Sequence, residues 1–528
     1  MRWILLAAMI SSAVIAKAQK QHYVDFYPNN QKASEGYFLR GLEHGVWTFW
    51  YESGEVKEKA HYYMGLFDGA VTHFYPNGNL KTEGYFKKDK QDSIMRHFAP
   101  NGVLLEEGSF VDDQKMGRWN AYDSVGNLIL REVYELERVL LMEYRDQAGN
   151  LSITNGEGTK KEVYSNGQTQ EVCAYIGGLR DGACNRFYRN GITKEKGYYS
   201  AGLKNGIWEI YFRDGTLKKN TKYTQGALDG EFIEYYPGGQ LNVKGNYTKG
   251  LKFGNWSWFT QEGVEEIAGQ FAFDMEDGDW VYRYPNGQKN SQGSYKQGSK
   301  IGLWNYWYST GEKWKEGPFA EDKKEGLWIY WFESGEKLME GSFKNDKEEG
   351  AWLSWYENGA VKDQGNYKAG KMNGKWNGFY PHEVRNYSGS WKDDVKVGEW
   401  SFWFETGETD ERGAYNDAGQ KHGKWEDFNE SGILISEGSY EKGIPDGKWV
   451  YYFPNGSIQR EQELDLGMLD GRVMTYARNG KVLEEANYKM NKLDGKFIIY
   501  NERTGKSENH LIYENGQVVK VILSNSRK

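Results

Sequence analysis

Residues 302–325 read GLWNYWYSTGEKWKEGPFAEDKKE, and residues 326–349 read GLWIYWFESGEKLMEGSFKNDKEE. The two stretches have equal length and place glycine and the aromatic residues at the same positions. A glycine followed two residues later by tryptophan returns at further multiples of 24 residues, at Gly206, Gly254, Gly350 and Gly398 among others. Self-similarity at a fixed period is the signature of a repeat architecture. The sequence therefore predicts an array of like units rather than several unrelated domains.

The period extends over almost the whole chain. Nineteen units align on a landmark residue, usually glycine, from Gly45 to Gly495. One step is longer, because 41 residues separate Gly117 from Gly158. We expect N-terminal repeats over residues 19–135, an irregular unit or hinge over 136–156, the main array over 157–513, and a capping strand and tail over 514–528.

Each unit has the pattern of a β-hairpin. Counted from the landmark residue as position 0, aromatic residues occupy positions 5 and 17 in seventeen of nineteen units each, and Trp occupies position 2 in twelve. Seven of the nine prolines stand at position 7, often followed by Asn-Gly, a pair that tolerates the corners of a tight turn. This predicts strands over positions 1–6 and about 11–17, with a polar, solvated loop over positions 19–23, as at residues 344–349.

Short connections on both sides of each strand exclude a parallel sheet, which needs long crossovers. We predict an all-β fold, an elongated single-layer antiparallel β-meander of about twenty 24-residue hairpin repeats. Glycine at position 15, as at Gly341 and Gly389, leaves room for a neighbouring ring over the backbone. Because positions 2 and 5 have opposite parity, we expect aromatic rings on both faces of the sheet.

These two aromatic rows are the residues to which we assign roles. Contiguous exposed apolar surface marks contact sites, so the row at position 5 is the candidate binding surface, with core packing as the alternative: Trp307, Trp331, Trp355, Trp403 and Tyr452. The row at position 2 is interpreted as structural packing: Trp304, Trp328, Trp352, Trp400 and Trp449.

Composition and charge exclude several classes of protein. The chain of 528 residues has 66 Gly, 21 Trp, 39 Tyr and 24 Phe but only 9 Pro, which is incompatible with a disordered chain, a collagen or a helical bundle. The formal net charge is −8, with both signs interspersed. No basic face is therefore expected for nucleic acid.

The first eighteen residues resemble a secretory signal peptide. A short apolar run from Ile4 to Ala16 follows Arg2 and ends at the small-x-small site Ala16-Lys17-Ala18. A buried strand or an uncleaved anchor is the alternative. Removal of residues 1–18 leaves a net charge of −10 and no segment apolar enough to span a membrane. We expect an exported protein of the periplasm, the outer surface or the extracellular space.

Cys173 and Cys184 are the only cysteines, eleven residues apart in strands expected to be neighbours. In an oxidising compartment they could form one disulfide. The alternative is that they are two small apolar residues that never meet.

No catalytic, cofactor or metal site is expected. His73 and His97 share position 4 of consecutive units, but two strands separate them by about 9.6 Å, too far for one ion. Residues 274–279 resemble the start of a calcium loop, yet Pro285 stands where a bidentate Glu is required. A repeat array spreads like groups along a line, whereas an enzyme needs unlike groups at one point. An enzyme remains possible only if residues 136–156 fold unlike the rest.

The unit that begins Gly447-Lys448-Trp449 and turns at Pro454-Asn455-Gly456 resembles the MORN-repeat variant, a hairpin repeat common in exported bacterial proteins. The resemblance extends from about Tyr23 to Tyr513. It implies an elongated β-meander used for binding or scaffolding, with a protein or a cell-envelope component as partner. Relatives often carry an antitoxin label, which remains a second alternative.

Strings such as Gly302-Leu303-Trp304-Asn305-Tyr306-Trp307-Tyr308 also resemble the cell-wall-binding repeats of surface proteins. In that family, aromatic residues of adjacent hairpins cage choline or stack on sugars. A glycan is therefore the alternative ligand.

Overall fold

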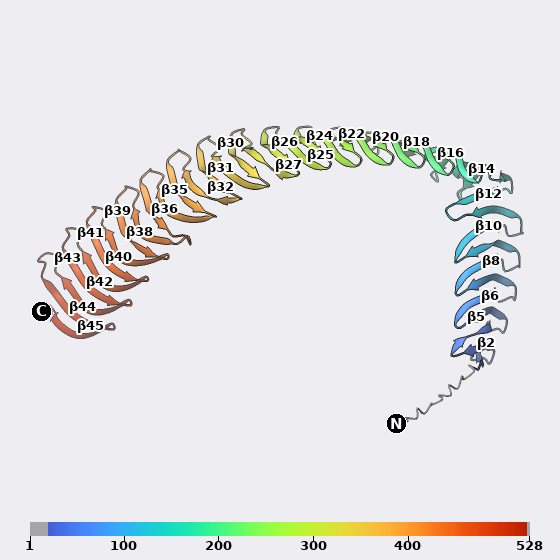
Figure 1. Cartoon of the computed structure of the whole chain (residues 1–528), viewed down its shortest axis with the longest axis horizontal. Helices are drawn as coiled ribbons and strands as arrows, with labels where there is room; N and C mark the ends of the chain where they lie inside the picture. The colour runs from blue at the N-terminus through green and yellow to red at the C-terminus, as the bar shows by residue number, and fades with distance from the viewer. Residues whose placement is uncertain (1–18, 525–528) are drawn as a thin grey trace, which may run out of the picture. The chain divides into compact units, whose positions relative to one another are not determined.

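The structure, a computed structural model, describes residues 19–524. The expected signal peptide over residues 1–18 and the end of the expected tail, residues 525–528, lie outside the described residues. Over residues 19–524 the chain forms 46 β-strands and no helix. This confirms the predicted all-β fold. The chain divides into two units, residues 1–251 and 252–528. Each unit is an antiparallel meander in which strands pair with their neighbours along the chain (Figure 1).

The strands of the first unit are β1 (Gln21–Phe26), β2 (Lys32–Leu39), β3 (Leu42–Glu43), β4 (Gly45–Trp50), β5 (Val56–Tyr63), β6 (Leu66–Phe74), β7 (Leu80–Lys87), β8 (Lys90–Phe98), β9 (Leu104–Val111), β10 (Gln114–Tyr122), β11 (Leu128–Tyr134), β12 (Val139–Arg145), β13 (Leu151–Thr154), β14 (Glu157–Val163), β15 (Thr169–Ile176), β16 (Leu179–Phe187), β17 (Thr193–Ser200), β18 (Leu203–Tyr211), β19 (Leu217–Thr224), β20 (Ala227–Tyr235) and β21 (Leu241–Thr248).

The remaining strands are β22 (Leu251–Phe259), β23 (Glu265–Ala272), β24 (Met275–Arg283), β25 (Lys289–Lys296), β26 (Ser299–Trp307), β27 (Lys313–Ala320), β28 (Lys323–Lys324), β29 (Gly326–Trp331), β30 (Lys337–Lys344), β31 (Lys347–Trp355), β32 (Val361–Lys368), β33 (Lys371–Met372), β34 (Gly374–Phe379), β35 (Arg385–Lys392), β36 (Val395–Trp403), β37 (Thr409–Tyr415), β38 (Lys421–Phe428), β39 (Leu434–Glu441), β40 (Ile444–Tyr452), β41 (Ile458–Asp465), β42 (Met468–Tyr476), β43 (Val482–Lys489), β44 (Lys492–Tyr500), β45 (Ser507–Glu514) and β46 (Gln517–Ser524).

The predicted hairpin turn is present. In the Pro-Asn-Gly turn that joins β24 to β25, Gly287 has the expected left-handed conformation, with φ of 87°. The amide nitrogen of Gly287 donates a hydrogen bond to the carbonyl oxygen of Tyr284 over 2.9 Å. The turn thus closes the hairpin as the sequence indicates, because glycine adopts this conformation without a steric penalty.

The loop between repeats is shorter than predicted. In most repeats the first strand begins three residues before the landmark, as β31 does at Lys347, so most of the predicted loop at residues 344–349 is strand. Only Asn345 and Asp346 form the turn, both with left-handed φ, 51° and 65°. The landmark glycine allows this extension. Gly350, with φ of 76°, lies beside a shift in the β30–β31 register, which identifies a glycine bulge.

Residues 136–156 form a shortened hairpin within the meander. β12 and β13 continue the antiparallel order, but β13 has only four residues. Because β13 is so short, the amide nitrogen of Leu141 in β12 reaches the carbonyl oxygen of Gly178, in the turn after β15, over 2.8 Å. Leu141 and Ile153 are buried with the two cysteines in one apolar cluster. The irregular stretch is therefore a variation of the repeat, not a separate fold.

Candidate functional site

The two faces of the sheet are unlike each other. The packed face carries positions 2, 4, 15 and 17, and the open face carries positions 1, 3, 5, 14 and 16. Cross-strand pairing fixes this division: Trp304 lies opposite Gly317, and Leu303 lies opposite Pro318. Successive side chains of a strand point to opposite faces, so each residue of these pairs shares a face with its partner.

The packed face buries the row of tryptophans at position 2. Trp328 is fully buried, and its indole ring makes edge contacts with Phe319 and Phe343, at centroid distances of 5.1 and 6.2 Å. The amine of Lys324 lies 4.7 Å from the centre of the same ring and covers it. The other members of the assigned structural row are also buried: Trp304, Trp352, Trp400 and Trp449. A single sheet thereby makes its own core, because aromatic rings of neighbouring repeats pack against the indoles, and lysine stems add cover over Trp304, Trp328 and Trp400.

Glycine at position 15 makes this packing possible. A Cβ added at Gly317 would stand 2.2 Å from the Trp328 ring, and one added at Gly341 would stand 2.1 Å from the Trp352 ring. The indole nitrogen of Trp328 also donates a hydrogen bond to the carbonyl oxygen of Pro318, over 3.1 Å. The expected close approach of a ring to a strand glycine is confirmed.

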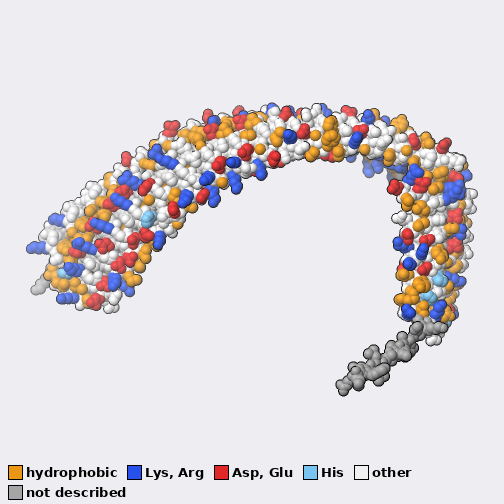
Figure 2. Space-filling model, viewed as in Figure 1, with side chains coloured by type: hydrophobic (Ala, Val, Ile, Leu, Met, Phe, Trp, Pro, Cys, Tyr) orange, Lys and Arg blue, Asp and Glu red, His pale blue; other side chains and the backbone are white. Residues whose placement is uncertain are grey.

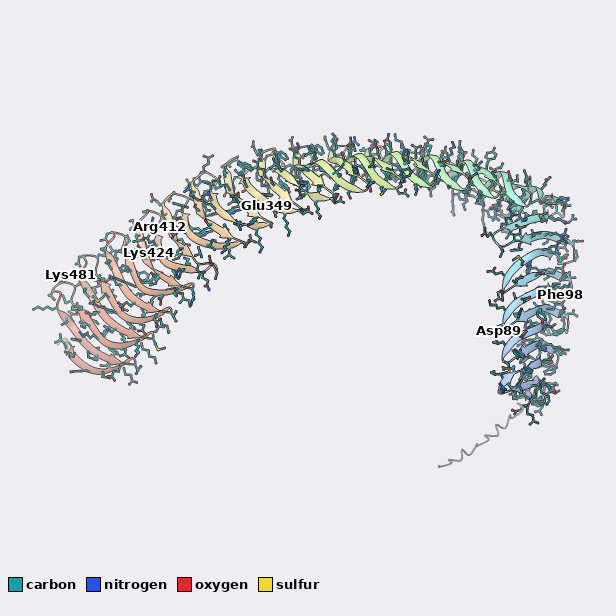
Figure 3. The ribbon with its side chains drawn as sticks, viewed as in Figure 1. Asp89, Phe98, Glu349, Arg412, Lys424 and Lys481 are labelled. Atoms are coloured by element: carbon teal, nitrogen blue, oxygen red, sulfur yellow. A yellow bond between two sulfur atoms is a disulfide. The ribbon has the colours of Figure 1, made fainter. Side chains whose placement is uncertain are left out.

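Side-chain hydrogen bonds join consecutive repeats along both edges of the sheet. At the turn edge, the hydroxyl of Tyr75, at position 6, donates to the carbonyl oxygen of Phe98 in the next repeat, over 2.8 Å. At the loop edge, the carboxylate of Asp89 accepts from the amide nitrogen of Phe67 in the preceding repeat, over 2.6 Å. Figure 3 labels Asp89 and Phe98.

Aspartates at position 20 are therefore structural acceptors. Asp346 does the same for the amide of Lys324, over 2.7 Å, and it remains an exposed turn residue, as the sequence predicts. The recurrence of Tyr at position 6 and of Asp at position 20 is visible in the sequence and could have identified both rows.

The open face holds the candidate binding row. Trp307, Trp331, Trp355, Trp403 and Tyr452 are all half-buried. A cation from the preceding repeat lies near each tryptophan ring, for example the amine of Lys313, 5.1 Å from the centre of the Trp331 ring. Such cation–π contacts contribute on the order of 0.5–1 kcal/mol when exposed. The rings of this row are held in place but not enclosed.

The open face also exposes aliphatic side chains on the strands that carry these rings. Leu303 and Leu327, at position 1, have 55% and 52% of their surface exposed. They share strands β26 and β29 with Trp307 and Trp331 and point to the same face. We call the set of Leu303, Trp307, Leu327 and Trp331 the apolar strip. Elsewhere on the visible surface, basic and acidic side chains are interspersed (Figure 2).

Toward the C-terminal end of the second unit, the aromatic residue of the open face takes part in an ionic network through its hydroxyl. The hydroxyl of Tyr452 donates to the Glu437 carboxylate over 2.7 Å, and Lys424 pairs with the same carboxylate over 2.8 Å. Burial, then the hydrogen bond to Glu437, raises the pKa of Tyr452 to about 12. Lys424, labelled in Figure 3, also contacts Glu426. Tyr452 is thus held within an ionic network, unlike the tryptophans of its row.

Cys173 and Cys184 form a disulfide between neighbouring strands β15 and β16. With Glu171 they are the one group in the described chain whose ligand atoms are spaced for a metal ion. Both sulfurs are taken up by the disulfide, and the Glu171 carboxylate contacts Arg180 and Arg186 at 2.7 and 2.6 Å. The residues at this position therefore do not offer a metal the thiolate ligands it would need.

The charged side chains of the irregular hairpin are engaged locally. Glu135 pairs with Arg138 over 2.5 Å, and Glu143 pairs with Arg131. The carboxylate of Asp146 accepts hydrogen bonds from its own turn. No helix among the described residues is long and apolar enough to cross a membrane.

Comparison with known protein families gives one result. The profile of the MORN repeat variant matches residues 43–62, 67–88, 228–249, 276–297, 324–345, 348–369, 421–442, 445–465 and 469–490. The chain belongs to the MORN repeat variant family. Each matched MORN segment begins near a landmark residue and covers one hairpin with its flanking turn.

Other comparisons add little to this assignment. No curated protein matches the chain. Among solved structures, it is similar to TcdB2-TccC3 without its hypervariable C-terminal region, with 9% identity, 95% of this chain and 30% of that chain covered, and a TM-score of 0.13. The Tc holotoxin pore of Photorhabdus luminescens gives 9% identity, 94% and 33% coverage, and a TM-score of 0.12. The MORN-variant chain spans about a third of these chains, and such TM-scores carry no argument about its function.

Proposed function

We propose that this chain is an exported, non-catalytic scaffold whose open face binds a protein or another component of the cell envelope. The observation that carries the proposal is the apolar strip, where Leu303 and Leu327 stand more than half exposed on the same face as half-buried Trp307 and Trp331. Exposed apolar residues that share a face with partly buried rings are typical of contact surfaces. Export rests on the sequence of residues 1–18.

The repeat architecture supports binding over catalysis. Equivalent side chains stand at the same position of every repeat and are therefore two strands, about 9.6 Å, apart. Such spacing suits an extended partner that contacts the equivalent side chains of successive repeats. It does not bring a nucleophile, an acid and a base to one point.

The experiment introduces charge into the apolar strip. Leu303→Lys with Leu327→Lys should abolish cross-linking of the full-length protein to its partner in native envelopes, because a buried, unpaired charge would oppose docking. Leu466→Lys is the matched control, since Leu466 has 58% of its surface exposed but lies in a loop. A monomer without any cross-linked partner, or equal cross-linking of all variants, would contradict the proposal.

A glycan is the second candidate, and one observation favours it. Trp314, an extra aromatic residue at position 12, keeps 39% of its surface exposed and lies 6.1 Å from Tyr308 between ring centres. Exposed aromatic rings of this kind stack on sugars. Binding to a glycan array or co-sedimentation with peptidoglycan that Trp314→Ala removes would support it, and failure of both assays would exclude it.

A further inference from the structure

Four cations gather at the turn edge of the first unit, away from the open face. Arg189 and Arg213 belong to the hairpin turns after β16 and β18, and Lys194 and Lys218 stand near the start of the strands that follow, β17 and β19. Arg189 lies over the Tyr164 ring and Arg213 over the Tyr188 ring, at 5.5 and 5.9 Å from the ring centres. Lys194 stands 6.0 Å from the centre of the same Tyr188 ring. Lys218 lies 5.6 Å from the Phe212 ring centre. Cations and rings therefore alternate across consecutive repeats.

No carboxylate neutralises this group. Among the described residues, Arg189, Lys194, Arg213 and Lys218 take part in no ion pair, whereas cations on the neighbouring strands do. Arg186 pairs with Glu195 over 2.9 Å, and Lys196 and Lys204 also have glutamate partners. The acidic residue next to Arg213 is Asp214, whose carboxylate already accepts hydrogen bonds from the amide and hydroxyl of Thr216. A concentrated positive charge thus remains at this edge of an acidic chain.

Three of the four cations, Arg189, Lys194 and Arg213, line a cleft of about 440 Å³, which Tyr164, Tyr188 and Asn190 complete. Neutral polar groups in the cleft are already engaged. The Asn190 side chain donates to the carbonyl oxygen of Arg213 and accepts from the amide of Ile192. The Tyr164 and Tyr188 hydroxyls donate to strand carbonyl oxygens. The charged side chains are therefore the groups in the cleft that are left to hold a ligand.

The arrangement is particular to these two repeats. Arg189 and Arg213 share position 7, and Lys194 and Lys218 share position 12. Elsewhere an arginine at position 7 or a lysine at position 12 occurs alone, as with Arg478 and Lys362. Position 7 usually holds proline, serine or glutamate instead.

We propose that this cleft binds an acidic peptide segment of a partner protein, whose carboxylates are held by Arg189, Lys194 and Arg213. Equivalent cations one repeat apart are separated by about 9.6 Å, which an extended peptide spans in about three residues. Arginine is suited to carboxylates because its planar donors bind them in pairs. A sugar would need free neutral donors, and here the amide of Asn190 and the hydroxyls of Tyr164 and Tyr188 are engaged. The cleft is separate from the apolar strip and does not depend on it.

The test uses the full-length protein and a fluorescent poly-glutamate peptide as the probe, with poly-glutamine as the uncharged probe. Wild type should bind poly-glutamate only, and binding should weaken as salt rises because the attraction is screened. Arg189→Gln with Arg213→Gln should weaken binding about tenfold or more, as expected for the loss of two charge-assisted contacts. Lys194→Gln with Lys218→Gln should act in the same direction.

The matched control is Lys362→Gln with Arg478→Gln, which removes the same charge from the same two repeat positions where each cation stands alone. It should leave affinity within about twofold of wild type. An equal loss of affinity in the control and in Arg189→Gln with Arg213→Gln would show that the probe responds only to the net charge of the protein, and it would overturn the proposal. Binding of an acidic polysaccharide in place of the peptide would assign the cleft to glycans and also overturn it, as would a failure to bind poly-glutamate.

Discussion

The indole ring of Trp328 lies against the backbone of Gly317, so close that a Cβ on that glycine would stand 2.2 Å from the ring. This contact recurs in most repeats and joins each one to the next, because the ring belongs to one repeat and the glycine to the preceding one. Its strength should therefore set the stability of the array, since each repeat of such a protein contacts only its neighbours.

Gly317→Ala should destabilise the second unit by about 2 kcal/mol, because the methyl group would displace a buried indole. The midpoint of urea unfolding, followed by tryptophan fluorescence, measures the effect. Gly84→Ala is the matched control. Gly84 occupies the same position in its repeat, but the repeat that follows has Met95 in place of tryptophan, and the added Cβ would meet Met95 at an ordinary 3.6 Å. Equal losses in both variants would show that the ring contact is not the cause.

Tyr308→Phe should cost about 1 kcal/mol, since it removes the 2.9 Å hydrogen bond to the carbonyl oxygen of Trp331 and leaves that oxygen without its side-chain partner. Hydrogen exchange of the amides around the turn at residues 332–336 should become faster. Tyr198→Phe is the control, because Tyr198 is largely exposed. A loss of stability in the control as large as that in Tyr308→Phe would contradict a role for the position-6 row.

Stability should fall in strong alkali through Tyr452. Its pKa in the folded protein, about 12, is higher than the ordinary value of 10.0, so folding favours the protonated phenol. This contribution is fully present below pH 10 and is lost as the pH rises toward 12. Wild type should therefore lose more stability over that interval than Tyr452→Phe, as measured by urea midpoints. Identical pH profiles would mean that burial and Glu437 do not perturb the phenol.

Reduction of the Cys173–Cys184 disulfide should destabilise the first unit by about 2–3 kcal/mol, because an eleven-residue separation closes a small loop. Hydrogen exchange should rise in β15, β16 and the irregular hairpin that packs on them, but not in the second unit. Cys173→Ala with Cys184→Ala should show the same change without reductant and no further response to it. An equal rise in both units would point to a general effect of the reductant.

The sequence predicts most of the packed face, because the ring at position 2 and the glycine at position 15 recur in register with the period. It does not predict what covers the rings. Lys324 precedes its landmark glycine in a stretch that reads as loop, and only the bulge at Gly326 keeps that lysine on the strand, over Trp328. The backbone hydrogen bond between Leu141 and Gly178 is also not predicted by the sequence, because it depends on the short length of β13. Arg189 and Arg213 could have been found by comparing position 7 between repeats.

The two tryptophan rows should differ in their reaction with solvent. Hydroxyl-radical footprinting with mass spectrometry should oxidise Trp307 and Trp331 faster than Trp304 and Trp328, because the first pair is half-buried on the open face and the second is enclosed. A bound partner should slow oxidation of the first pair only. If all four indoles react at one rate in the free protein, the two faces are equally covered and the apolar strip is not available for docking. Protection of Trp307 and Trp331 by the partner that persists in Leu303→Lys with Leu327→Lys would show that the two leucines do not take part in docking.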